Sequence, residues 1–426
     1  MRWSDPYPHF LFFWAIPVAG SLLAWRAVAL FRGAGVPDPR RTLGFAAALL
    51  GTRAAFGLVL YLLLDYRSEG HLWHWVRVHA LPILEGQVPG RDFLNGYGPL
   101  LPYAQALSVL LLGSPLSVFL PFILGDVLAV ILSWRVARRV GTEGDGAAAV
   151  LWTLWSPLLW VQVWVGSQDE PLFAGAVVVA LWFVAAGRPL ATGIALGLGL
   201  ALTKSTFALY GLAVAMALWP DRRALARTCL GGLATTAAVY GAYLAAGARL
   251  NDYPFQEHFR IFRTYGVSLP DGLQAFLDLP EALLLACAVA GTAGPLLAAG
   301  FAVRRWREAP PAARACAAVA AAHCVFMALM PGALNHYFVQ GAVAVTLLLV
   351  PRRDEPTARS LLAANTILAC LLSLSWNGAP TLLGFREPGF EILLLGRAFK
   401  IGCILFHVSL LAWILGRRFP SHPRTA

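Results

Sequence analysis

Residues 115–134 read PLSVFLPFILGDVLAVILSW, and this stretch decides the fold. An α-helix needs about 20 mostly apolar residues to cross the hydrocarbon core of a membrane, which is the length of this run. Arg135, Arg138 and Arg139 follow it. Because basic residues accumulate on the cytoplasmic side of a membrane, the pattern predicts a transmembrane helix that ends in the cytoplasm.

The composition extends this prediction to the whole chain. Of its 426 residues, 58% are hydrophobic and 13% are charged. Soluble domains have roughly 45–50% and 25%, respectively. Apolar runs recur from one end of the chain to the other and leave no room for a separate soluble domain. We therefore predict an all-α, multi-span bundle that forms a single transmembrane domain over residues 1–426.

The placement of the basic residues predicts the orientation. The net charge of +11 would suggest nucleic-acid binding in a soluble protein. Here the basic clusters alternate with loops poor in basic residues, so positive-inside orientation explains most of the charge and argues against a nucleic-acid partner. The pattern predicts about 13 spans, with the amino terminus outside and the carboxyl terminus in the cytoplasm. We predict that these clusters form short loops, at residues 31–41, 135–139, 222–227, 304–314, 352–359 and 417–424.

Two predicted outer loops hold most of the polar residues. The first, residues 65–113, contains Trp73 and Trp75, which favour a helix lying in the membrane interface, and then a second helix too short to span. Its segment 85–102 is rich in glycine and proline and must form an ordered turn around Arg91 and Asp92. That pair is either a structural salt bridge or part of a site. The second loop is residues 248–281.

Ionisable groups near lipid are costly and often functional. Lys204 interrupts the apolar run 189–219, which predicts two short helices meeting at the outer side, with the lysine facing a phosphate or carboxylate. Asp169 and Glu170 precede Pro171, so they either cap a helix or serve a site. Glu69 is either a solvated loop acid or a general base whose pKa is raised by apolar neighbours.

Other outer residues allow two interpretations each. In the second loop, His258, Arg260 and Arg263 alternate with aromatic residues, which suits an interfacial helix or a lipid-phosphate or sugar site. His336 and Tyr337 line a cavity or lie at the interface. Glu69 lies near two histidines, but this spacing does not make a convincing metal site, and we predict no metal and no other cofactor.

The first loop resembles that of the C-type membrane glycosyltransferases, which include polyprenyl-phosphate-mannose-dependent and lipid A aminoarabinose transferases. The resemblance lies in GQVPGRDF at residues 86–93 and YGPL at residues 97–100, with Gly90 where these enzymes usually have tyrosine. Further similarities are Glu69-Gly70, with Ser68 where aspartate is common, and three later segments. These are Gln168-Asp169-Glu170, the run from Gly193 to Lys204, and Asn335-His336-Tyr337.

The resemblance implies an inverting transfer of a sugar, mannose or another hexose or pentose, from a polyprenyl-phosphate donor to a lipid, glycan or protein hydroxyl. The reaction would take place at the outer face of a bacterial inner membrane. The general base would be Glu69, Asp92 or Asp65. Lys204, Arg260 and Arg263 would hold the leaving phosphate. Further substrate contacts are expected from Arg91, Tyr97, Asp169, Glu170, His258, His336 and Tyr337.

Two other functions would use a similar cavity. A flippase or transporter of lipid-linked glycans predicts internal repeats and polar residues near the membrane midplane, whereas the ionisable residues here gather at one face and no repeat is visible. A ligase or polymerase of lipid-linked glycans would differ only in using a diphosphate-linked donor.

Overall fold

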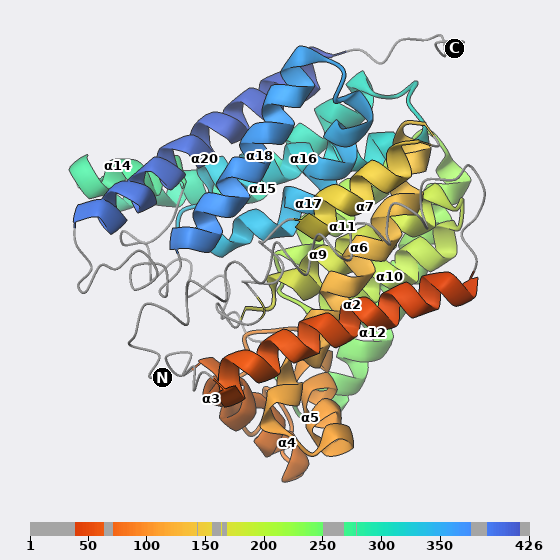
Figure 1. The fold of residues 1–426 in the computed structure, drawn as a ribbon, viewed down its shortest axis with the longest axis vertical. Helices are drawn as coiled ribbons and strands as arrows, with labels where there is room; N and C mark the ends of the chain where they lie inside the picture. The colour runs from red at the N-terminus through yellow and green to blue at the C-terminus, as the bar shows by residue number, and fades with distance from the viewer. Residues whose placement is uncertain are drawn as a thin grey trace.

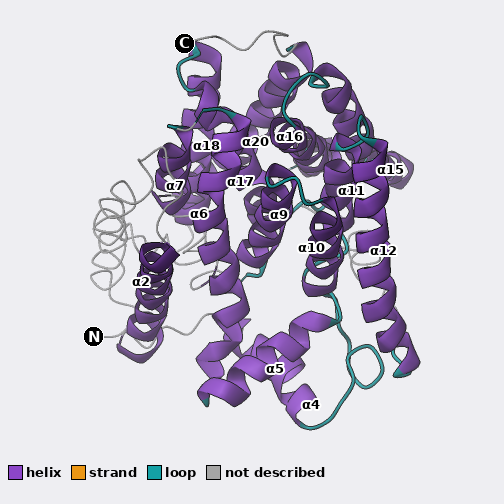
Figure 2. Cartoon of the chain, turned by 90° about the vertical axis from the view of Figure 1, so that its right-hand side faces the viewer, coloured by secondary structure: helices purple, strands orange, loops and turns teal. Residues whose placement is uncertain are grey.

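The predicted all-α class is confirmed. The computed structural model describes residues 39–63, 71–142, 144–155, 163, 168–249, 268–277, 279–375 and 390–417. Within these ranges every named element is a helix, and the extended pairing is a single bridge between Pro89 and Phe93. The helices pack side by side in a tilted bundle (Figures 1 and 2).

The stretch at residues 115–134 forms a short 3₁₀ turn, η3 (Pro115–Phe119), and then the helix α6 (Leu120–Val140). The helix continues beyond Trp134, so Arg135, Arg138 and Arg139 lie in its last turns, and the prediction that they form a loop was wrong. Arginine is a good helix former and can extend a span into the interface.

The basic cluster at residues 222–227 shows the same difference. These residues form the first turns of α12 (Arg222–Ala245) rather than a loop. Asp221 caps this helix, since its Oδ1 accepts hydrogen bonds from the backbone N–H groups of Arg223 and Ala224, both at 3.0 Å. The cap provides acceptors for N–H groups that have no partner within the helix.

The described residues contain five helices that are long and apolar enough to cross a membrane. Shorter apolar helices accompany them, so this is an integral membrane protein, while the count of about 13 spans stays a prediction. The five segments are Pro39–Leu62, Pro115–Val140, Glu281–Arg305, Pro311–Leu329 and Phe399–Gly416.

The first predicted outer loop forms a group of short helices at one end of the molecule (Figure 1). They are α3 (His71–His74), the π-helix η2 (Trp75–Ala80), α4 (Leu81–Leu84) and α5 (Leu100–Leu112). The brief helix predicted before residue 113 is therefore confirmed as α5. Trp73 is half exposed, at 51%, as an interfacial aromatic side chain would be.

The helix α16 (Pro311–Leu329) forms the centre of the bundle and is almost entirely buried. It packs against α11 (Phe207–Ala217), α15 (Glu281–Arg305), α17 (Phe338–Leu349) and α20 (Phe390–Gly416). Its many alanines allow neighbouring helices to approach closely, as is usual in membrane bundles. The remaining helices are α7 (Asp145–Trp155), α9 (Glu170–Ala185), α10 (Pro189–Leu202), α14 (Leu269–Leu277), η4 (Asn335–Tyr337), η5 (Val350–Arg352) and α18 (Pro356–Ser375).

A buried ion pair joins α6 to α2 (Pro39–Leu58), which continues as η1 (Val59–Leu63). Arg53 Nε lies 2.6 Å from Asp126 Oδ2, and both side chains are almost fully buried. A charge at this depth is costly unless it is paired. Pairing with Arg53 thus explains how Asp126, the one acidic residue of the stretch at residues 115–134, is tolerated inside the bundle.

Candidate functional site

A cluster of buried charged groups lies where the two short helices α10 and α11 meet. Lys204 Nζ lies 2.8 Å from Asp169 Oδ1 and 2.6 Å from Glu170 Oε1. All three residues are buried. The carboxylates come from the start of α9, so the cluster joins two parts of the chain that are far apart in sequence.

The break between α10 and α11 positions Lys204, as the sequence predicted. The helix α10 ends at Leu202, and Thr203 leaves the helical conformation with φ −122° and ψ −145°. The Thr203 hydroxyl donates a 2.7 Å hydrogen bond to the Gly199 carbonyl and so closes the last turn. The chain resumes as a helix at Phe207. Lys204 therefore leaves the helix axis and points between neighbouring elements.

Asp169 occupies the N-cap position of α9, yet its side chain makes no capping hydrogen bond. The interpretation of this residue as a helix cap is therefore wrong. Its Oδ1 faces Lys204 instead. Two further oxygens, Asp169 Oδ2 and Glu170 Oε2, have no hydrogen-bond partner among the described residues. Buried carboxylate oxygens usually have partners, so these two are available to a ligand or water.

Burial and the neighbouring opposite charge shift the pKa of Asp169 in opposite directions, and they do the same for Lys204. Removal from water raises the pKa of Asp169 to about 6, even though the nearby ammonium of Lys204 lowers it. Burial lowers the pKa of Lys204, but the two carboxylates outweigh this and hold its pKa well above the ordinary value. Lys204 is therefore charged at neutral pH. The pKa of Asp169 lies close enough to neutral pH for this carboxyl group to gain or lose a proton there.

Aromatic and histidine side chains complete the cluster. His336 Nε2 lies 3.6 Å from Glu170 Oε1. The ammonium of Lys204 lies over the ring of Tyr337, at 4.9 Å from its centroid, and over that of Tyr97, at 5.6 Å. Such cation–π contacts stabilise a lysine that has left bulk water. The structure thus brings together six residues predicted as substrate contacts: Tyr97, Asp169, Glu170, Lys204, His336 and Tyr337.

The first loop contacts this cluster through Gly98. Its backbone N–H donates a 2.5 Å hydrogen bond to the Thr203 carbonyl, next to Lys204. A β-carbon at position 98 would meet the backbone of Ala201, so only glycine allows this approach. The YGPL segment at residues 97–100 is therefore the point where the loop docks on the break between α10 and α11.

Arg91 and Asp92 form the structural salt bridge that was one of the two interpretations of this pair. Arg91 Nη2 lies 2.8 Å from Asp92 Oδ2, which also accepts a 2.7 Å hydrogen bond from the Val88 N–H. The hydrogen bonds from Arg91 and then Val88 lower the pKa of Asp92. Arg91 also donates to the Ala246 carbonyl at 3.2 Å, which attaches the loop to the end of α12.

The unusual glycine at position 90 has a steric explanation. Gly90 has φ +74°, a left-handed conformation that strains other residues. A β-carbon there would collide with the Tyr243 hydroxyl and lie 2.9 Å from the Arg249 carbonyl oxygen. The departure from the tyrosine usual in C-type enzymes thus lets the first loop pack against α12.

Five predicted site residues lie outside the described residues. They are Asp65 and Glu69 in the first loop and His258, Arg260 and Arg263 in the second. Of the three candidate bases, the structure therefore describes only Asp92. Among the described residues no group of three histidine, cysteine, aspartate or glutamate side chains is placed to hold a metal ion. Metal dependence stays a prediction.

A buried histidine beside Tyr97 was missed. His79 Nδ1 lies 2.8 Å from Gln105 Oε1, and its ring makes an edge contact with Tyr97 at 5.4 Å between centroids. Burial lowers the pKa of His79 to about 4, so this ring is neutral. Gln105 inside the apolar helix α5 was the available sequence signal, because a buried amide needs a polar partner.

Comparison with known proteins places the chain among membrane enzymes. The model of "Glycosyltransferase family 87" matches residues 97–331, which begin at Tyr97 and include Asp169, Glu170 and Lys204. Among the curated proteins no match was found. The chain is similar in fold to ArnT from Cupriavidus metallidurans bound to undecaprenyl phosphate, at 18% identity, TM-score 0.50, and coverage of 88% of this chain and 78% of that one. The apo structure of ArnT gives 17% identity, TM-score 0.49, and coverage of 87% and 78%.

Proposed function

Because the chain belongs to glycosyltransferase family 87, we propose that it transfers a sugar from a polyprenyl-phosphate donor to a lipid, glycan or protein hydroxyl. Membership of the family supports the transfer of a sugar. The lipid class of the donor is carried over from ArnT, the neighbour of similar fold whose structure holds undecaprenyl phosphate. Mannose is our first choice of sugar, and other hexoses and pentoses remain candidates.

The observation that carries the proposal is the buried cluster around Lys204. An ammonium group has three N–H donors. One of them donates to Glu170 Oε1 at 2.6 Å, and Asp169 Oδ1 lies 2.8 Å from the nitrogen as an ion-pair partner. An N–H group that the carboxylates leave unused is available for a phosphate oxygen of the polyprenyl-phosphate substrate. Loss of the phosphate leaving group needs positive charge at the oxygen that departs. Lys204 would supply this charge, together with Arg260 and Arg263 of the second outer loop.

The aromatic and polar residues around Lys204 would then hold the sugar. Tyr97, His336 and Tyr337 surround the ammonium, and the spare oxygens of Asp169 and Glu170 can accept hydrogen bonds from sugar hydroxyls. His258 would contact the donor from the second loop. Arg91 would act indirectly, since its side chain ties the first loop to α12.

The general base is proposed to come from the first loop. It would take the proton from the acceptor hydroxyl, whose oxygen forms the new bond to the anomeric carbon as the bond from that carbon to the phosphate oxygen breaks. Inversion follows from this single displacement. Glu69 is the first choice and Asp65 the second. Asp92 comes third, because its bonds to Arg91 and Val88 lower its pKa and make it a weaker base.

The setting of the reaction belongs to the same proposal. The resemblance to C-type enzymes suggests a bacterial inner membrane, and the basic clusters favour a carboxyl terminus in the cytoplasm and a site on the outer face. One transmembrane domain over residues 1–426, without metal or other cofactor, would perform the transfer.

The test measures transfer by the purified full chain in liposomes, with labelled polyprenyl-phosphate mannose, then other polyprenyl-phosphate sugars, and membrane lipid extract as the acceptor. Removing a general base lowers rates by roughly 10²–10⁴-fold. We expect that loss for Glu69→Gln or Asp65→Asn, and a smaller one for Asp92→Asn. The control is Asp354→Asn, an exposed acid far from the cluster.

Two results would contradict the proposal. Wild-type transfer rates in all three base variants would contradict catalysis by a base from the first loop. Transfer from a diphosphate-linked donor, without transfer from any monophosphate-linked sugar, would assign the protein to the ligase or polymerase class instead.

A further inference from the structure

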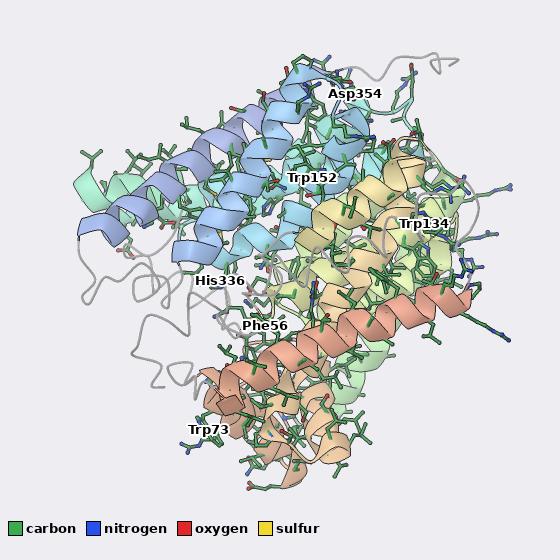
Figure 3. The ribbon with its side chains drawn as sticks, viewed as in Figure 1. Phe56, Trp73, Trp134, Trp152, His336 and Asp354 are labelled. Atoms are coloured by element: carbon green, nitrogen blue, oxygen red, sulfur yellow. The ribbon has the colours of Figure 1, made fainter. Side chains whose placement is uncertain are left out.

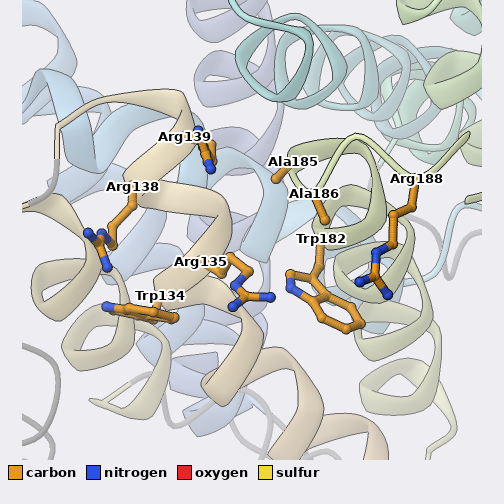
Figure 4. Close-up of a pocket in the computed structure, with 8 residues that line it drawn as sticks. All are labelled: Trp134, Arg135, Arg138, Arg139, Trp182, Ala185, Ala186 and Arg188. Carbon is orange, nitrogen blue, oxygen red and sulfur yellow. The ribbon is translucent and has the colours of Figure 1, made fainter. Parts of the chain in front are cut away.

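A second polar site lies at the other end of α6 and α9. It is a cavity of about 580 Å³, within the usual size of small-molecule sites. Figure 4 shows four arginine and two tryptophan side chains around it, from the end of α6 and from the end of α9 and the turn that follows. They are Arg135, Arg138, Arg139, Arg188, Trp134 and Trp182.

This cavity is separate from the cluster around Lys204. The helix α9 has 16 residues and starts at Glu170. At about 1.5 Å per residue its two ends are roughly 24 Å apart. In Figure 3, His336 lies left of the centre of the molecule, and Trp134 lies well to its right and higher. The two sites therefore lie at opposite ends of α9.

The cavity has the chemistry of a phosphate site. Among the described residues that line it, four are arginines and none is acidic. The Arg135 guanidinium lies between two indole rings, 5.8 Å from the centroid of Trp134 and 5.6 Å from that of Trp182. Stacking fixes the plane of a guanidinium, whose paired N–H groups match two oxygens of a phosphate. The indole N–H of Trp182 is buried and has no acceptor among the described residues.

The surroundings of the cavity favour a lipid over a free ion. Leu128 lies seven residues before Arg135, on the same face of α6, and is 41% exposed. On α10, Leu190 follows Arg188 closely and is 47% exposed. Tryptophan and arginine are typical of the headgroup level of a membrane. Acyl chains could therefore run along these leucines while a headgroup occupies the cavity.

We propose that this cavity binds the phosphate of an anionic membrane phospholipid on the face opposite the transfer site. Arg135 and Arg138, both half-buried, would contact the phosphate, and the exposed Arg139 and Arg188 would close over it. The lipid would join the ends of α6 and α9, two helices that pack closely along their length. This site is independent of the identity of the donor and acceptor.

The test titrates the purified full chain in neutral detergent with phosphatidylglycerol, phosphatidylcholine or inorganic phosphate. Thermal stability and the lipid retained in native mass spectrometry are measured. The variant is Arg139→Gln/Arg188→Gln, because both residues are exposed and their loss should leave the fold intact. The control is Arg222→Gln/Arg223→Gln, which removes the same charge outside the cavity. Arg222 also stacks on a tryptophan, with its Cζ 3.9 Å from the ring centroid of Trp219.

We expect phosphatidylglycerol, and not phosphatidylcholine, to stabilise the wild-type chain and the control. The cavity variant should bind it on the order of thirtyfold more weakly, from the usual contribution of two basic residues near an anionic lipid. Equal weakening in the control would show diffuse attraction and overturn the site. Equal stabilisation by inorganic phosphate would overturn the assignment to a lipid.

Discussion

At the scale of single residues, one ammonium group and two carboxylates hold each other in the interior of the bundle. Lys204, Asp169 and Glu170 each stood out as a charge among apolar residues. Their convergence could not be predicted, because the lysine and the carboxylates belong to helices whose relative positions depend on packing across the bundle. The capping interpretation of Asp169 was wrong for a similar reason: a nearby buried ammonium attracts the carboxylate more strongly than backbone N–H groups do.

The prediction at this scale concerns Lys204→Met, which keeps the side-chain length and removes the charge. Two buried carboxylates would lose their counter-charge, and breaking a buried ion pair in this way costs about 3–5 kcal/mol. We expect a marked fall in the thermal unfolding temperature in detergent. The control, Lys204→Met/Asp169→Asn/Glu170→Gln, should recover most of this loss. A single variant as stable as the wild type would contradict the buried pairing.

At the scale of helices, hydropathy predicted the helix α6 but misplaced its end. The two short helices around Lys204 were predicted correctly because a charge in an apolar run must lie in a break or a cavity. The end of α6 and the start of α12 were misplaced because an apolar run is interrupted by arginine, whereas an α-helix can include arginine. The run from Gly193 to Lys204 resembles a segment of the C-type enzymes, and the structure shows what its glycines do.

The role of these glycines is close helix packing. A β-carbon at Gly193 would collide with the Thr228 carbonyl on α12, and one at Gly197 would lie 2.8 Å from the Thr235 side chain. Glycines at this spacing form one face of α10 and allow its backbone to contact α12. Since Lys204 follows the end of α10, the same contact also fixes the position of the charged cluster.

We therefore expect Gly193→Ala to push α10 away from α12. Overpacking of this kind costs about 1–3 kcal/mol, and the displacement of Lys204 should reduce transfer as well. The matched control is Gly51→Ala in α2, where a β-carbon meets nothing within 4 Å. This change should be neutral or stabilise the helix by up to about 1 kcal/mol. Both quantities can be measured by thermal unfolding and by the transfer assay. Equal behaviour of the two variants would refute the packing role.

At the scale of the whole molecule, the orientation rests on the distribution of charge. The arginine-rich ends of α6 and α12 and the loop near Asp354 lie away from the short helices of the first loop, and Figure 3 shows Trp73 and Asp354 at opposite ends. A sequence can indicate such a distribution because positive charges select the cytoplasmic side. The number of spans is harder to predict, since half-length helices such as α10 and α11 do not cross a membrane alone.

The orientation can be tested by labelling with an impermeant maleimide in intact cells. The background is Cys229→Ser, which removes the exposed thiol among the described cysteines. Glu85→Cys and Asp354→Cys lie at exposed positions at the two ends. We expect Glu85→Cys to be labelled in intact cells, and Asp354→Cys only after permeabilisation. The reverse pattern would place the charged cluster on the cytoplasmic side and contradict transfer at the outer face.

The helix α9 links the two charged sites, and its polarity gives this arrangement an electrical consequence. The peptide dipoles of a helix sum to partial positive charge at its start and partial negative charge at its end. Asp169 and Glu170 lie at the start of α9, and Arg188 lies just after its end, so both sets of charges complement the helix macrodipole. If the arginines lie in the cytoplasm as predicted, the inside-negative membrane potential also favours their position, by about 2.3 kcal/mol per elementary charge per 100 mV. An energised membrane would thus hold this enzyme in the orientation that its charges select during insertion.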